Sequence, residues 1–194
     1  MIIIEGPEGS GKSRLADLLR RNTSFEVHHF GAPPSSIEEL DRRLDRSREM
    51  LTLPVIQDRS PWVSEPIYSV LLGQGPVTTW PAYVGGLRAM NAKVIYCRPP
   101  DETIRDSMCQ SPKTYKNATY EKRILLNASW LISLYDDFMD QLDPWIRFDW
   151  TLESGRLVEK RLVRLLEEWR SASKEMDNDR DGEGDQESNA GAGE

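Results

Sequence analysis

An apolar strand that runs straight into a glycine-rich loop restricts the fold of this chain more than any other feature. Residues 1–5 form an unbroken apolar run that ends in Glu5, which is typical of a strand buried on both faces. The loop Gly6-Pro7-Glu8-Gly9-Ser10-Gly11-Lys12-Ser13 follows at once and matches G-x-x-x-x-G-K-S at every fixed position. A helical pattern then begins. The sequence therefore predicts a parallel α/β sheet with a phosphate-binding loop at the carboxyl edge of its first strand.

The residue types of this loop suit the triphosphate of a nucleotide. Its glycines let the backbone curl so that N–H groups face phosphate oxygens, and the following helix adds the partial positive charge of its N-terminus. Lys12 is expected to bridge the β- and γ-phosphates, and the Ser13 hydroxyl is expected to bind Mg²⁺. We therefore predict ATP and Mg²⁺ as cofactors, with all eight residues of the loop at the nucleotide.

The rest of the chain alternates short apolar strands with helices. Further strands are expected at 25–30, 54–57, 93–97 and 145–150, and helices at 12–21, 64–72, 79–90, 120–142 and 158–169. Another helix starts at the capping box Ser36-Ile37-Glu38-Glu39, with Ile37, Leu40 and Leu44 at helical spacing. Residues 101–116 have no strong apolar stripe and are expected to form a mobile lid. The predicted fold is α/β: a three-layer P-loop NTPase fold with a parallel sheet of about five strands and helices on both faces.

Candidate catalytic residues follow two of the expected strands. Asp58 ends the strand at 54–57, where a carboxylate is needed for Mg²⁺ or for the proton of an acceptor hydroxyl, and Arg59 beside it is expected to hold the transferred phosphoryl group or the substrate. Arg98 and Arg105 near the expected lid are candidates for cations over the γ-phosphate, because phosphoryl transfer must exclude water. The alternatives are a structural ion pair for Asp58-Arg59 and solvated surface charge for the other two arginines.

The net charge of −7 is concentrated at the end of the chain. Residues 175–194 contain eight acidic residues and one Arg, which leaves 24 acidic and 24 basic residues in 1–174. We therefore expect one domain over residues 1–172 and an acidic, disordered tail over 173–194. A regulatory role, in which the tail competes with a polyanion for basic sites, is the alternative to a plain solvating tail. No apolar run is long enough for a membrane span, and Cys97 and Cys109 have no spacing for a zinc site or a disulfide, which favours a cytoplasmic location.

The motifs together resemble the thymidylate kinase and deoxynucleoside kinase superfamily over about residues 1–170. They are the phosphate loop, Asp58-Arg59-Ser60 with Ser64-Glu65-x-x-Tyr68, Tyr96-Cys97-Arg98-Pro99-Pro100 and the long helix from Tyr120. More narrowly, the chain resembles bacteriophage thymidylate-kinase-like proteins, some of which are 5-hydroxymethyluracil DNA kinases. The resemblance implies an ATP-dependent kinase in the host cytoplasm that phosphorylates the base hydroxymethyl group of a nucleotide within DNA, a step in thymidine hypermodification. Homodimers are frequent in the superfamily, but the sequence leaves the oligomeric state open.

One departure from the superfamily bears on the acceptor. Thymidylate kinases carry an Arg-Glu-Pro element after the second strand, whose Arg grips the monophosphate, whereas residues 28–34 here contain no Arg or Lys. This difference favours an acceptor without a terminal monophosphate, such as a nucleotide inside DNA. A kinase for free thymidylate or deoxynucleosides, and an ATP-binding module without transfer activity, remain the other hypotheses. Four aromatic residues are candidates for stacking on the acceptor base: Phe30, Trp62, Tyr68 and Trp80.

Overall fold

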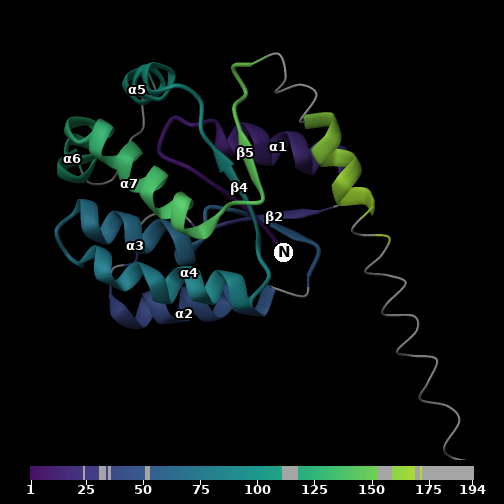
Figure 1. Cartoon of the computed structure of the whole chain (residues 1–194), viewed down its shortest axis with the longest axis horizontal. Helices are drawn as coiled ribbons and strands as arrows, with labels where there is room; N and C mark the ends of the chain where they lie inside the picture. The colour runs from purple at the N-terminus through teal and green to yellow at the C-terminus, as the bar shows by residue number, and fades with distance from the viewer. Residues whose placement is uncertain are drawn as a thin grey trace, which may run out of the picture.

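The computed structural model describes residues 1–23, 25–30, 34, 36–50, 53–110, 118–152, 159–168 and 171. Its centre is a five-stranded sheet in which every pairing is parallel, in the order β2-β3-β1-β4-β5 (Figure 1). The strands are β1 (Ile2–Glu5), β2 (Glu26–His29), β3 (Val55–Asp58), β4 (Lys93–Cys97) and β5 (Ile146–Phe148). The predicted sheet of five parallel strands is confirmed. The expected acidic tail at 173–194 lies outside the described residues.

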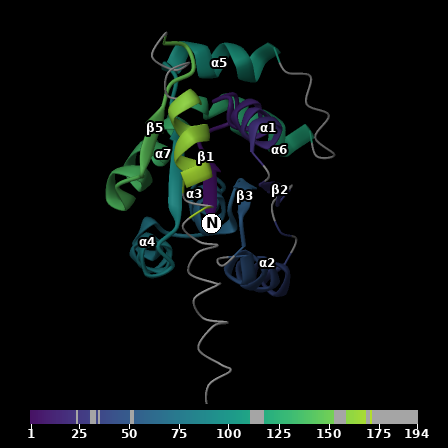
Figure 2. The same cartoon turned by 90° about the vertical axis from the view of Figure 1, so that its right-hand side faces the viewer.

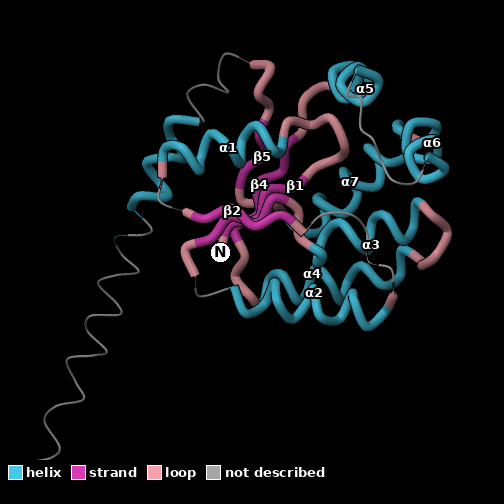
Figure 3. Tube along the Cα trace, turned by 180° about the vertical axis from the view of Figure 1, so that it is seen from behind, coloured by secondary structure: helices cyan, strands magenta, loops and turns pink. Residues whose placement is uncertain are grey.

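Alternation along the strands divides the core into two layers. Ile2 and Ile4 of β1 pack on one face of the sheet, against Leu15 and Leu19 of α1 (Lys12–Asn22) and against the helical segment 159–168. Ile3, between them, points to the other face. That face is covered by α3 (Pro61–Leu71), α4 (Trp80–Ala89) and α7 (Ala128–Leu142). In Figure 3, α1 lies on one side of the strands, and α3 and α4 lie on the other.

The remaining elements flank this sandwich. They are α2 (Ile37–Glu49), the short η2 (Val77–Thr79), α5 (Asp101–Gln110) and α6 (Ala118–Leu126). The predicted cap of α2 is present, because the Ser36 side chain accepts a hydrogen bond from the backbone N–H of Glu39. Ile37 is nevertheless 75% exposed, so the spacing argument wrongly placed it on the buried side of that helix.

Two expectations about the second half of the chain need correction. Residues 101–110, expected to belong to a mobile lid without a strong apolar stripe, form helix α5 with a small buried side, and this helix lies across one end of the sheet (Figure 2). Asp101 and Glu102 suit its N-terminus, and Ile104 and Met108, four residues apart, are its buried side. The long helix expected over 120–142 is instead two helices, α6 and α7, which meet at Asn127. The Asn127 side chain donates to the Arg123 carbonyl at 2.8 Å, which helps to end the first helix.

Cys97 is buried, Cys109 is exposed, and both are free thiols. Within the described part of the chain, no helix has the length and apolar character needed to cross a bilayer.

Candidate active site

The phosphate loop is held in its curled shape by close packing on both sides. Gly9 and Gly11 have φ of 76° and 88°, a left-handed conformation that side chains rarely adopt. A Cβ on Gly9 would lie 2.7 Å from the Ile104 carbonyl of α5, and one on Gly11 would lie 2.6 Å from Nε1 of Trp150. The Trp150 indole also donates to the Ser10 carbonyl at 3.1 Å. The loop therefore requires glycine at both positions, and α5 and Trp150 fix its backbone.

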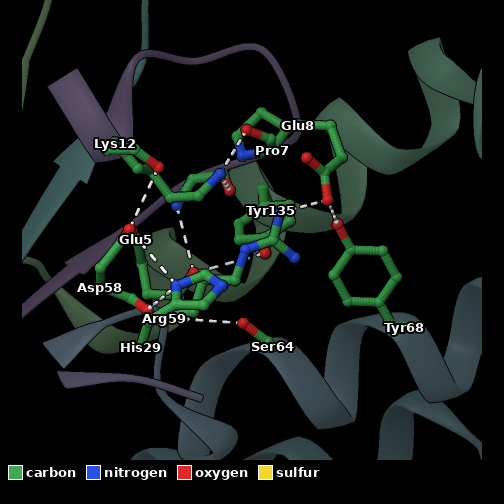
Figure 4. Close-up of polar contacts among 12 residues, drawn as sticks. Glu5, Pro7, Glu8, Lys12, His29, Asp58, Arg59, Ser64, Tyr68 and Tyr135 are labelled. Atoms are coloured by element: carbon green, nitrogen blue, oxygen red, sulfur yellow. Dashed lines mark hydrogen bonds and ion pairs between the residues drawn. The ribbon is translucent and has the colours of Figure 1, made fainter. Parts of the chain in front are cut away.

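Lys12 lies inside the curl of this loop. It is only 5% exposed, and its ammonium donates to the carbonyls of Gly6 at 2.6 Å and Pro7 at 2.7 Å (Figure 4). Burial, followed by the nearby charge of Arg59, lowers the pKa of Lys12 to about 8. The side chain is thus a desolvated cation at the mouth of the loop, which is where phosphate oxygens would be stabilised most strongly.

Ser13, Asp58 and His29 form a chain of polar contacts at the carboxyl edge of the sheet. The Ser13 hydroxyl donates to Oδ2 of Asp58 at 3.1 Å, and Nδ1 of His29 lies 3.4 Å from the same oxygen and 3.0 Å from the Asp58 carbonyl. Burial alone would raise the pKa of the Asp58 carboxyl. The hydrogen bond with His29 and the charge of Lys12 outweigh burial and hold that pKa below its ordinary value. The same contact with Asp58 raises the pKa of His29.

The Ser13 and Asp58 pair fits a Mg²⁺ ion bound to a nucleotide. Hydroxyl and carboxylate oxygens are ligands that Mg²⁺ prefers, and such sites commonly use one or two protein groups together with phosphates and water. The second carboxylate oxygen, Oδ1 of Asp58, is buried without a hydrogen-bond partner, which leaves it available to a metal or to a metal-bound water. Among the described residues no cluster of three or more metal-binding side chains occurs, so phosphates would have to complete the coordination.

Arg59 lies next to Asp58 in an unusual backbone conformation. Its φ of 69° is left-handed, and its amide donates to the Ile4 carbonyl of β1 at 3.1 Å. Left-handed non-glycine residues are found preferentially at functional sites, because the surrounding structure must offset their strain. The guanidinium forms an ion pair with Glu8 of the phosphate loop, and the Tyr68 hydroxyl donates to the same Glu8 carboxylate at 3.3 Å. The phosphate loop, β3 and α3 are thereby joined around one partly buried cation.

Glu5 supports this arrangement from below. Its carboxylate is fully buried and accepts hydrogen bonds from the Ser60 amide at 2.5 Å, the Ser64 hydroxyl at 2.8 Å and the Tyr135 hydroxyl at 3.4 Å. Burial raises the pKa of Glu5, and the charges of Lys12 and Arg59 oppose that rise. Glu5 therefore connects β1, α3 and α7 behind the cations of the site.

Comparison with solved structures agrees with the fold described above. No protein-family model matches the sequence, and no curated protein matches it either. Among solved structures, the YorR protein of Bacillus subtilis, in complex with phosphorylated GDP, superposes with a TM-score of 0.60 at 18% identity, over 86% of this chain and 95% of that chain. Deoxyadenosine kinase from M. mycoides with bound dATP superposes with a TM-score of 0.55 at 19% identity, over 83% of this chain and 98% of the kinase.

This is the P-loop kinase fold. It accounts for the position of the site, because in parallel α/β sheets ligands bind at the carboxyl ends of the strands. Strand register places Asp58 of β3 level with His29 of β2 on one side and with Ile4 of β1 on the other. The predicted residues Lys12, Ser13, Asp58 and Arg59 therefore come together at one edge of the P-loop kinase fold, as the sequence analysis expects.

The other two predicted arginines are placed differently. Arg98 forms a two-pronged ion pair with Asp136 of α7, with both N–O distances at 2.8 Å, and a further pair with Asp101 at 2.7 Å. These contacts raise its pKa and use its donors to join β4, α5 and α7 of the P-loop kinase fold. Arg105 is half exposed and lies 3.4 Å from Asp101. Among the described residues neither arginine forms a hydrogen bond or an ion pair with the phosphate loop, and the ion pairs of Arg98 give it an anchoring role.

The four candidate stacking residues also separate. Trp80 is 1% exposed, donates to the Pro66 carbonyl and packs edge-on against Phe138, so it belongs to the core and is not available for a base. Trp62 packs on Gly86 and edge-on against Tyr83. Tyr68 is buried with its hydroxyl on Glu8, and Phe30 lies at the wall of an open groove.

That groove is a feature which the sequence analysis misses. It has a volume of about 520 Å³ and runs between the end of β2, with His28, His29 and Phe30, and a face of α2 with Arg42, Arg43 and Arg46. No Arg or Lys follows β2 directly in the sequence. In the structure the cations come from α2, and Arg43 donates to the Phe30 carbonyl at 3.1 Å. The available signal was an unusual density of arginines in the helix.

Proposed function

We propose that this chain is an ATP-dependent kinase that uses Mg²⁺ and phosphorylates an alcohol group of a deoxynucleotide. The observation that carries the proposal is the Ser13 hydroxyl 3.1 Å from the Asp58 carboxylate, at the mouth of a complete phosphate loop. Lys12 would neutralise the β- and γ-phosphates, and Ser13 and Asp58 would hold Mg²⁺. Arg59, a partly buried cation, would stabilise the transferred phosphoryl group.

The transfer itself needs one base and one leaving group. The acceptor oxygen attacks the γ-phosphorus, the bond from that phosphorus to the β–γ bridging oxygen breaks, and ADP leaves. Asp58, whose lowered pKa keeps it ionised, is the candidate to take the proton of the acceptor hydroxyl, directly or through a water. A carboxylate that is ionised at neutral pH suits this role and the metal role alike.

For the acceptor, we propose the base hydroxymethyl group of 5-hydroxymethyldeoxyuridine within DNA. Two observations support it: β2 ends in His29 without an adjacent Arg for a terminal monophosphate, and an open basic groove begins beside that residue. A substrate that continues beyond the acceptor nucleotide is compatible with both. A kinase for free thymidylate is the second candidate, favoured by one specific observation: Arg43 of α2 reaches the Phe30 carbonyl, close to where a monophosphate would need a cation.

Transfer of labelled γ-phosphate separates these candidates. ATP is offered with DNA containing 5-hydroxymethyluracil, as single strand and as duplex, with matched thymine DNA, and with free thymidine and thymidine monophosphate. Label in the hydroxymethylated DNA alone supports the proposal, and label in the free nucleotides alone refutes the DNA acceptor. A protein that binds ATP but transfers no label to any of them would be a binding module. Lys12→Ala serves as the inactive control for all arms.

A further inference from the structure

The groove beside β2 has a charge distribution that nothing in the phosphotransfer chemistry requires. Arg42 and Arg46 are exposed and lie one turn apart on α2, and in the part of the chain that the structure describes neither has an acidic partner. Like charges four residues apart destabilise a helix by a few tenths of a kcal/mol. Arg43 between them is paired with Glu39. Within the described residues the groove therefore carries two guanidinium groups that form no ion pair, and an anion would relieve their repulsion.

The groove is also connected to the catalytic edge of the sheet. His29 contributes to its wall, while Nδ1 of the same ring lies 3.0 Å from the Asp58 carbonyl. A ligand in the groove would thus lie beside the residue that is hydrogen-bonded to the candidate base.

We propose that this groove binds the phosphodiester backbone of the polynucleotide strand that carries the acceptor. The inference rests on the proposed function and names the surface that holds the rest of that substrate. Guanidinium groups bind phosphate oxygens with two parallel hydrogen bonds, and two of them one helical turn apart can hold neighbouring phosphates of one strand. Arg43, engaged with Glu39 and the Phe30 carbonyl, would keep the β2 end of the groove in place.

The length of the groove favours a strand over a single phosphate. Its lining on α2 runs from Glu39 to Met50, which corresponds to about 16 Å of helix at 1.5 Å per residue. A single phosphate group could reach Arg42 and Arg46 together, because they are one turn apart, but it would fill only a part of that length. A backbone with one charge per nucleotide would neutralise both, and counterion release would add to its affinity.

Binding of a labelled oligonucleotide tests the groove independently of catalysis. A fluorescein-labelled single-stranded 12-mer is titrated with the full chain by fluorescence anisotropy, without ATP, at several salt concentrations. Arg42→Ala/Arg46→Ala should bind about tenfold more weakly, and the slope of log K against log salt should shrink by about 1.4, at about 0.7 per lost contact. The matched control Arg20→Ala/Arg164→Ala removes the same charge from exposed ion pairs with Asp17 and Glu168 on other helices, and it should bind like wild type.

Each other result has a definite meaning. Wild-type binding by the Arg42→Ala/Arg46→Ala variant, or an equal loss in the control, would overturn the groove as a DNA site. Displacement of the 12-mer by thymidine monophosphate at the same phosphate concentration would show a single-phosphate site and would overturn it too. If the 12-mer binds through the groove but labelled ATP transfers nothing to DNA containing 5-hydroxymethyluracil, the proposed function fails and the groove stands.

Discussion

Lys12 is expected to lose its charge only slightly above neutral pH, and this should make ATP binding pH-dependent. Burial in the loop, with Arg59 close by, lowers its pKa from 10.5 to about 8 in the unliganded protein. Phosphate oxygens favour the charged form, so in the complex the pKa rises again. Binding therefore takes up a proton above pH 8, and the affinity falls as the pH increases.

The size of the effect follows from the pKa. At pH 7 about ten molecules in eleven carry the charged Lys12, whereas at pH 9 only about one in eleven does. Since the competent form sets the apparent affinity, the dissociation constant should rise about tenfold between these values. The ATP phosphates do not contribute to this change. Like the phosphate of phosphoserine, they lose their last proton near pH 6, below the range that is compared.

Isothermal titration with a non-hydrolysable ATP analogue and Mg²⁺, at fixed ionic strength from pH 7 to 9, measures this directly. Lys12→Ala should bind weakly and with little pH dependence, while Lys160→Ala, which removes an exposed lysine from the helical segment 159–168, should reproduce the wild-type decline. A wild-type affinity that stays constant from pH 7 to 9 would refute the reasoning, because it would mean that Lys12 is not a desolvated cation.

Four further predictions test other parts of the site. Asp58→Asn should lower the rate of phosphoryl transfer about 10²–10⁴-fold in the label assay, and a near-normal rate would exclude both roles given to it. Gly9→Ala should lower the free energy of unfolding by about 1–3 kcal/mol, and the thermal midpoint with it. The reason is that φ at this position is 76° and the added Cβ would collide with the α5 backbone. Trp150→Phe keeps an aromatic ring but loses the hydrogen bond and the indole contact with the phosphate loop, so ATP affinity should fall several-fold in calorimetry, and unchanged affinity would contradict this. Burial raises the pKa of Glu65 to about 7, so wild-type stability should decrease from pH 5 to 8 relative to Glu65→Gln, and parallel denaturation midpoints would contradict the shift.

The ATP side of the site could be predicted from sequence because it is local. Gly6 to Ser13 are contiguous, and the chemistry of such a loop depends on backbone curvature and one helix N-terminus. The sheet could be predicted equally well, since runs such as residues 2–4 and 93–97 are short and mostly apolar. The surface helices were predicted less well. Two buried apolar residues, Ile104 and Met108, are too few to predict α5 from the sequence, and Ile37 follows helical spacing yet is exposed.

The acceptor side could not be predicted in the same way because it is assembled from distant segments. Glu8 binds Arg59 across 51 positions, and Glu5 reaches Tyr135 across 130. No local pattern encodes such pairs. Arg98 was misjudged for the same reason. A basic residue at a strand end is a natural candidate for a catalytic cation, and the sequence does not show that its partner is Asp136, far along the chain.

The missing arginine after β2 takes on a different meaning in three dimensions. In the sequence its absence argues against an acceptor with a free terminal monophosphate, whereas in the fold α2 brings three arginines to the same strand end. The question is therefore how those charges are arranged. One of them is neutralised by Glu39 and bonded to the main chain, and the other two face an open groove about three turns long. One terminal phosphate would fill only a part of that groove, because its lining is spread along the helix side from Glu39 to Met50. That spread is the reason to test a strand of DNA before a free nucleotide.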